Sequence, residues 1–174
     1  MKTTDIILAG IVGTTAFTAF SYLVSKTMDK NFKEPRLLGK MVDDIMPGMQ
    51  EKESQFTGWL IHYLTGVAFA GAYKALIDST GIKPSVRNGV IAGAVSGFPA
   101  GLLWDTSLKL HPTPPRKRTA NYYLHLALGH AIFGAASFFV FGLLNKHRDE
   151  KYITSPIDEQ SADSKLSQYA TAGS

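Results

Sequence analysis

The hydrophobic residues of this chain gather into four long runs, separated by polar, charged and proline-containing stretches. Each run has about the 20 residues that an α-helix needs to cross the ~30 Å hydrocarbon core of a membrane. A soluble amphipathic helix would carry a charged face, and these runs have almost none. The pattern therefore predicts an all-α, polytopic membrane protein in which residues 1–144 form a four-transmembrane-helix bundle. The predicted spans are residues 6–25, 58–77, 89–108 and 122–144.

A shorter amphipathic pattern lies between the first two runs, at residues 35–46. Pro35 favours a helix start there, and the pair Pro47-Gly48 favours a stop. We expect a short helix that either lies in the membrane interface or caps one end of the bundle. Its apolar positions recur at three- and four-residue spacing and are Leu37, Leu38, Met41, Val42, Ile45 and Met46.

The ends of the chain and its composition refine this picture. Lys2 and the apolar run after it resemble a signal peptide, but no clear small-x-small cleavage site follows, so we interpret the run as an uncleaved first span. Residues 145–174 are rich in Ser, Asp, Ala and Lys and are predicted to form a polar, disordered tail. The net charge is +4, but no basic face with interleaved aromatic residues indicates nucleic-acid binding. The expected partner is the lipid bilayer. Cysteine is absent, which excludes disulfides and thiolate metal sites.

The third run places a glycine at every fourth position: Gly89, Gly93, Gly97 and Gly101. In a soluble helix each glycine costs about 1 kcal/mol relative to alanine. In lipid, small residues at this spacing let two helix backbones approach closely. The row therefore predicts a close-packing surface for another span of the same chain or for a second copy in a homo-oligomer. A helix broken around Pro99 is the alternative interpretation.

Asp105 continues the row at the same spacing. Each step of four residues advances about 400° around a helix, so Gly97, Gly101 and Asp105 lie within about 80° of one another. We therefore expect the carboxylate to face the packed side. Ionisable groups inside a membrane are candidates for function when they have a partner.

Histidines of the neighbouring runs are the expected partners of Asp105. At 1.5 Å per residue, His62 lies about 7 Å into the second run and Asp105 about 7 Å before the end of the third. On the fourth run His125 lies at a similar depth, and His130 lies roughly 8 Å deeper. The spacing predicts a polar layer of His62, Asp105 and His130 between helices.

A second stripe on the second run shares the face of His62. Gly66 and Tyr73 lie on it. Gly66 is expected to permit another close helix contact, and Tyr73 is expected to belong to the polar site.

The polar layer admits four functions. It could be a structural hydrogen-bonded network, or a proton-responsive site, because imidazole titrates near neutral pH. It could also bind haem or a metal through paired histidines, or take part in substrate transport. No dedicated cofactor motif is present, so no cofactor is predicted and haem remains the alternative. The sequence offers no set of nucleophile, base and orienting residue for hydrolysis, and we do not expect an enzyme.

The segments WLIHYLTGVAFAGAYKAL, HPTPP and NYYLHLALGHAIFG, in this order, resemble the YagU-like family of small bacterial inner-membrane proteins. The resemblance covers roughly residues 57–144. It includes the eleven-residue spacing of His62 and Tyr73, the turn at residues 113–115, and the pair Gly129-His130. The chain differs at Asp105, near which the family shows a histidine.

The resemblance implies a multi-pass protein of the cell inner membrane with a link to survival of acid stress. We therefore expect a non-enzymatic integral inner-membrane protein that acts in acid or pH stress. The alternative is a small haem-binding or proton-coupled transport component.

Overall fold

The computed structural model describes residues 2–27, 33–113 and 120–154, with side chains described up to residue 148. These residues form five α-helices and no strand, which confirms the all-α prediction. The helices are α1 (Thr3–Thr27), α2 (Glu34–Ile45), α3 (Glu51–Thr80), α4 (Val86–Leu110) and α5 (Ala120–Thr154).

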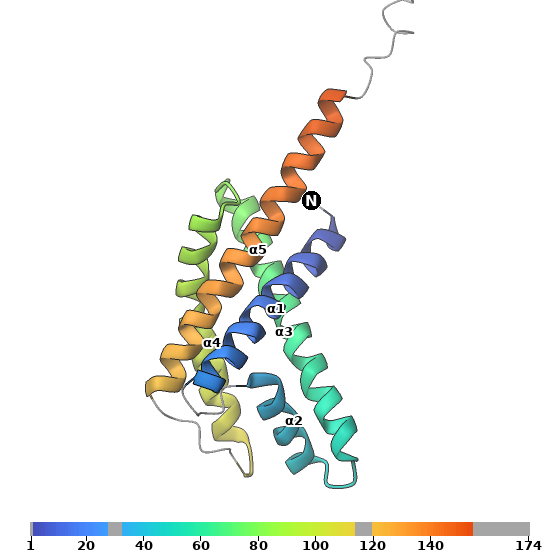
Figure 1. The fold of residues 1–174 in the computed structure, drawn as a ribbon, viewed down its shortest axis with the longest axis vertical. Coiled ribbons are helices and arrows are strands. Elements are labelled where there is room, and N and C mark those ends of the chain that lie inside the picture. Colours follow the sequence, from blue (N-terminus) through green and yellow to red (C-terminus); the bar gives the residue numbers. More distant parts are fainter. Residues whose placement is uncertain (1, 28–32, 114–119, 155–174) are drawn as a thin grey trace, which may run out of the picture. The chain divides into compact units, whose positions relative to one another are not determined.

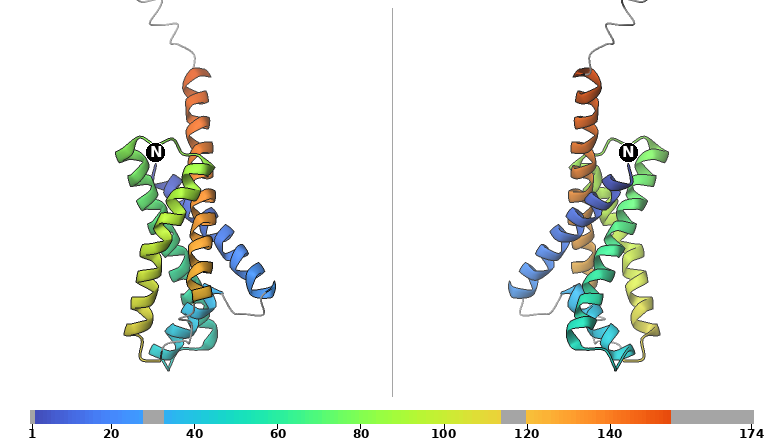
Figure 2. Two further views of the ribbon diagram at one scale, coloured as in Figure 1. Left: turned by 90° about the vertical axis from the view of Figure 1, so that its left-hand side faces the viewer. Right: turned by 90° about the vertical axis from the view of Figure 1, so that its right-hand side faces the viewer.

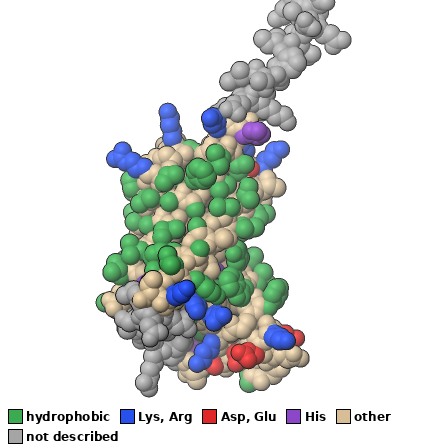
Figure 3. Space-filling model, in the orientation of Figure 1, with side chains coloured by type: hydrophobic (Ala, Val, Ile, Leu, Met, Phe, Trp, Pro, Cys, Tyr) green, Lys and Arg blue, Asp and Glu red, His purple; other side chains and the backbone are tan. Residues whose placement is uncertain are grey.

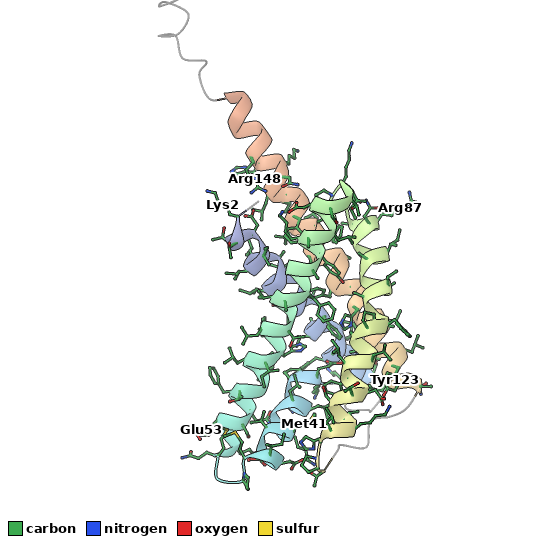
Figure 4. The ribbon with its side chains drawn as sticks, turned by 180° about the vertical axis from the view of Figure 1, so that it is seen from behind. Lys2, Met41, Glu53, Arg87, Tyr123 and Arg148 are labelled. Carbon is green, nitrogen blue, oxygen red and sulfur yellow. The ribbon has the colours of Figure 1, made fainter. Side chains whose placement is uncertain are left out.

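The chain divides into two compact units, residues 1–142 and 143–174. In the first unit the long helices α1, α3, α4 and α5 run alternately in opposite directions, and α2 lies at one end beside α3 (Figures 1 and 2). Lys2 and Arg87 mark one end of this unit, and Met41 and Glu53 mark the other (Figure 4).

Within the described part of the chain, three helices are long and apolar enough to cross a membrane: Thr3–Thr27, Glu51–Thr80 and Ala120–Arg148. Figure 3 shows a broad cover of hydrophobic side chains over the middle of the face in view, with charged side chains toward the ends. Helix α4 is not among the three. Its four glycines, Pro99 and several polar residues lower its average apolarity, although its 25 residues give it sufficient length.

The turn between α3 and α4 follows from the residues at the helix ends. Gly81 ends α3 in the left-handed conformation, with φ of 68°, where a residue without a Cβ is favoured. Ser85 then starts α4, and its hydroxyl accepts a hydrogen bond from the Asn88 backbone N–H. The two helices are thereby joined by a short connection at one end of the unit.

Helix α2 packs on the end of the long helices. A Cβ added to Gly39 would lie 2.9 Å from the Gln55 Cα, so α2 and α3 approach to backbone contact. His111, directly after α4, donates from Nε2 to the Met41 carbonyl at 3.0 Å, because the Thr113 N–H already donates to its Nδ1. Helix α2 therefore packs against the end of α3 and contacts the segment that follows α4.

The glycines of α4 lie against α5. A Cβ added to Gly93 would approach the Ala131 Cα to 2.8 Å, and one added to Gly97 would approach the Ala127 Cα to 3.0 Å. Helix α4 continues through Pro99 without a break. The glycine surface is therefore filled by another helix of the same chain.

The room for an added Cβ differs between the two ends of the glycine row, and Gly66 on the second stripe has none. A Cβ added to Gly89 would lie 2.7 Å from the Phe138 Cβ, whereas one added to Gly101 would lie 3.7 Å from the nearest atom of Tyr123, an ordinary contact. Gly66 of α3 faces α1, where an added Cβ would collide with the Thr14 hydroxyl. Close packing thus requires glycine at Gly89 and Gly66 but not at Gly101.

The predicted tail begins too early. Residues 145–154 are helical and continue α5, and the Arg148 guanidinium donates to the Asn145 side chain at 2.7 Å, one turn earlier. The polar composition of this stretch predicts disorder, but side-chain pairs three residues apart stabilise a polar helix. Residues 155–174 of the predicted tail lie outside the described residues.

Gly93→Ala should destabilise the protein. Overpacking against the α5 backbone costs about 1–3 kcal/mol, and the gain in helix propensity of about 1 kcal/mol offsets it only in part. Gly101→Ala is the matched control, because its methyl group has room and only the propensity gain remains. Thermal unfolding of the protein in lipid nanodiscs measures both effects. Equal unfolding temperatures for the two variants would contradict the close α4–α5 contact.

Candidate functional site

Three buried histidines surround the ring of Phe17 on α1. The ring centroid of Phe17 lies 6.0 Å from that of His62, 6.3 Å from that of His125 and 5.3 Å from that of His130. His62 comes from α3, and the other two come from α5. We call Glu34 and these three histidines the histidine cluster. It occurs where α1 packs between α3 and α5.

A carboxylate reaches this cluster from α2. Glu34 Oε1 lies 3.1 Å from His125 Nε2, and the side chains of the two residues are only 4% and 3% exposed. Ser21 Oγ of α1 lies 3.0 Å from the same nitrogen. An ionised carboxylate only accepts hydrogen bonds, so Nε2 then carries a hydrogen; a neutral Glu34 would donate its own. In either form one proton lies between the two residues.

The hydrogen bonds also define the neutral form of His62. The Thr18 hydroxyl donates its one hydrogen to the Thr14 carbonyl at 2.7 Å, so its oxygen can only accept from His62 Nε2, 3.0 Å away. The neutral His62 ring is therefore protonated at Nε2, and its Nδ1 is an acceptor.

His130 has the opposite arrangement. Its Nδ1 lies 2.9 Å from the Leu126 carbonyl oxygen one turn earlier on α5. A carbonyl only accepts, so Nδ1 carries the hydrogen and the Nε2 of the neutral ring is an acceptor. Phe69 of α3 meets this ring edge-on, with centroids 5.3 Å apart.

A cavity of about 280 Å³ lies beside the histidine cluster. Its polar walls include Glu34, His62, His130 and Trp104. Its aromatic walls include Phe17, Phe69 and Phe133. All five helices contribute to the lining, so the cavity is a product of the tertiary fold rather than of any one helix.

Asp105 lies elsewhere. It forms an ion pair with Lys109, one turn later on α4, with 2.6 Å between Oδ2 and Nζ, and it accepts a hydrogen bond from the Tyr123 hydroxyl at 3.1 Å. It borders a separate groove that Gly97 and Gly101 also line. The predicted layer of Asp105 with His62 and His130 is therefore not formed. The offset of about 80° estimated from Gly97 is large enough to turn the carboxylate toward Tyr123 and the partly exposed surface.

Tyr73 is also outside the cluster. Its hydroxyl lies 2.6 Å from Ser96 Oγ of α4, and its ring packs against Phe133 and Phe138 of α5 at 5.7 and 5.5 Å. Tyr73 therefore links α3 to α4 and α5, toward the end of the unit opposite α2. His62, His125 and His130 are thus the members of the predicted site that the structure brings together.

The sequence interpretation missed the carboxylate and the hydroxyls of this site. Glu34 stands directly before Pro35, where a first-turn acid is usually solvated and only stabilises the helix start. The hydroxyls had a visible signal, because they repeat at helical spacing along one face of the first run. They are Thr14, Thr18, Ser21 and Ser25, and all are buried.

The cluster has limited capacity for a metal or haem. Among the residues that the structure describes, no three His, Asp or Glu side chains gather as a metal site would require. One nitrogen each of His62 and His130 is already hydrogen-bonded within the protein. The cavity is at the lower limit of the ~300–1,000 Å³ typical of small-molecule sites, which leaves little room for a porphyrin.

Comparison with known proteins gives no relative from which a role could be transferred. No protein-family model matches this chain, and neither a curated protein nor a solved structure matches it. The residues and their geometry are therefore the basis for a functional assignment.

Proposed function

We propose that this chain is a non-enzymatic integral membrane protein with four spans, α1, α3, α4 and α5, whose buried histidine cluster makes its structure responsive to pH. The resemblance of residues 57–144 to YagU-like proteins supports a location in a bacterial inner membrane and a role in acid stress. The single observation that carries the pH response is the Glu34–His125 pair, which lies among two further buried histidines.

The case for α4 as a fourth span is geometric. Helix α3 ends near the end of the unit where α4 begins, and α5 begins toward the opposite end (Figures 1 and 4). The 25 residues of α4 extend about 37 Å, more than the ~30 Å hydrocarbon core. Its glycine surface is packed on α5, so the low apolarity of α4 reflects helix contact rather than water contact.

The case for a pH response depends on the balance of titratable groups in the cluster. The groups that face Glu34 are His125 and Tyr122 of α5, and Glu34 also interacts electrostatically with His62 and His130. Beside the cluster, helix α1 contributes the neutral hydroxyls of Thr18 and Ser21, and α4 contributes the indole of Trp104.

This balance determines whether acidification stabilises or destabilises the fold. The single carboxylate can compensate one protonated imidazole but not three. Acidification therefore leaves positive charge in an apolar interior, and unpaired buried charge destabilises a fold strongly. We expect the cluster to loosen at acidic pH, which would release α2 from α1 and α5.

Cysteine labelling tests the four-span topology directly, because the chain has no native cysteine. Exposed positions are available in three connections: Gly48, Lys83 and Pro112. Single variants Gly48→Cys and Pro112→Cys should react with a membrane-impermeant maleimide from one side of the membrane, and Lys83→Cys from the other. Labelling of Lys83→Cys and Pro112→Cys from the same side would show that α4 does not cross.

Glu34→Gln should steepen the acid sensitivity of the protein. Removing the one carboxylate leaves the protonated imidazoles uncompensated, so the unfolding temperature should fall further than in the wild type as the pH drops from about 7.5 to about 5. A difference of 1–2 kcal/mol corresponds to about 2–8 °C for a protein of this size.

Asp105→Asn is the matched control for this experiment, because it removes a carboxylate that lies outside the cluster. Its pH profile should follow that of the wild type. If Glu34→Gln and Asp105→Asn gave the same profile, the histidine cluster would have no part in the pH response.

A further inference from the structure

The cavity beside the histidine cluster has more volume than the hydrogen bonds within the cluster account for. Its volume is about 280 Å³. This is close to the lower end of the range for small-molecule sites, about 300 Å³. The space therefore suits a head group the size of one substituted ring, with any long tail outside it.

The cavity reaches the surface between α3 and α4. Ile61 and Thr65 of α3 and Leu103 and Ser107 of α4 line it and are exposed. Figure 4 shows α3 and α4 on the side of the unit nearest the viewer, with α2 at their lower ends. In a chain embedded in lipid this opening faces the hydrocarbon, so a membrane-soluble molecule can enter sideways.

Two residues that line the cavity each carry a buried polar atom that has no hydrogen-bond partner within the described residues. The two atoms are Glu34 Oε2, on a residue that is 3% exposed, and Trp104 Nε1. One is an acceptor and the other a donor. Buried polar atoms are nearly always paired in folded proteins, so both atoms indicate a bound group that donates and accepts.

The other lining residues restrict the charge and shape of that group. No Lys or Arg is among the described residues that line the cavity, which disfavours a carboxylate or phosphate head. Glu34 already interacts with His125 through its other oxygen, so an ammonium head would find no uncompensated anion. The aromatic walls favour a flat ring, because aromatic pairs gain from edge and offset contacts.

We infer that this cavity binds the ring-hydroxyl head of a neutral membrane-soluble phenol or quinol, whose apolar tail leaves between α3 and α4. The hydroxyl donates to Glu34 Oε2 and accepts from Trp104 Nε1, and the Nδ1 of His62 and the Nε2 of His130 provide further acceptors for a second hydroxyl. The inference rests on the membrane location proposed above and not on the pH response.

The test uses the full chain in lipid nanodiscs at neutral pH with four probes that carry tails of nine or ten carbons: para-decylphenol, decan-1-ol, decylammonium and decanoate. Trp104 reports occupancy by its fluorescence emission in a Trp59→Phe background, which leaves one tryptophan. Decylphenol should give a saturable change, with apparent affinity at least about tenfold higher than that of the other three probes. The alcohol arm separates a ring hydroxyl from an aliphatic one.

Two variants connect the signal to the site. Thr65→Phe blocks the opening and should weaken decylphenol binding at least about tenfold, and Glu34→Gln should weaken it because the anionic acceptor is lost. Leu64→Phe adds the same ring to an exposed neighbour that does not line the cavity, and binding should be unchanged. Thr65 is exposed, so its variant remains informative even if Glu34→Gln fails to fold.

Each contrary result overturns the inference. Tighter binding of decylammonium or decanoate would indicate a charged ligand, and equal binding of decan-1-ol would remove the requirement for a ring. Equal decylphenol binding by Thr65→Phe and Leu64→Phe would show that the probe acts through the bilayer and not at this cavity. Cysteine labelling of the same preparation shows separately whether the proposed membrane topology holds.

Discussion

The buried end of the unit is subject to one constraint: a carboxylate that is buried away from water needs a hydrogen-bond partner that shares a proton with it. Glu34 meets it at His125, with 3.1 Å between Oε1 and Nε2, and Ser21 meets the same nitrogen. Removing one member of such a buried pair typically costs about 3–5 kcal/mol. The contact joins α2, α5 and α1 at one point, at the end of the unit where α2 lies.

Close backbone contacts bring the long helices together around that point. Gly93 and Gly97 let α4 lie directly on α5, and Gly66 lets α3 lie directly on α1 beside Thr14. Lipid offers helices little gain from hiding apolar side chains, so contacts of this kind hold membrane helices together. The aromatic rings that fill the interior do not fill it completely, and the cavity remains beside the histidine cluster. Small residues thus allow the close helix contacts, and large aromatic residues line the cavity that remains between the helices.

The sequence predicted the features that depend on local pattern. Four apolar runs became four long helices, and the short amphipathic stretch became α2. The sequence predicts His62, His125 and His130 in a polar site between helices, with His130 roughly 8 Å deeper than His125. In the structure all three lie around Phe17. The predicted site was wrong where it depended on the rotation of a residue around its helix axis or on contacts between residues far apart in the sequence.

Two residues show why that part could not be predicted. Asp105 belongs to the glycine row by spacing, but a rotation of about 80° over two steps turns it toward Tyr123. Glu34 is separated from His125 by 91 positions and precedes a helix expected to meet water or the membrane interface, so no local pattern indicated its burial. The repeat of hydroxyls along the first run was the one available signal that this face meets polar groups.

The proposed pH response and the proposed ligand site involve the same side chain, Glu34. Under the proposed pH response, the protons that the cluster holds determine how firmly α2 is attached, and the same Glu34 lines the cavity. Proton binding and occupation of the cavity should therefore influence each other through one side chain.

Solid-state NMR of the protein in lipid bilayers, labelled at glutamate and aspartate carboxyl carbons and at histidine ring nitrogens, tests this account most directly. The account predicts a dipolar coupling between the Glu34 carboxyl carbon and His125 Nε2, consistent with the 3.1 Å contact of Oε1. A coupling of Asp105 to His62 or His130, with none between Glu34 and His125, would contradict it.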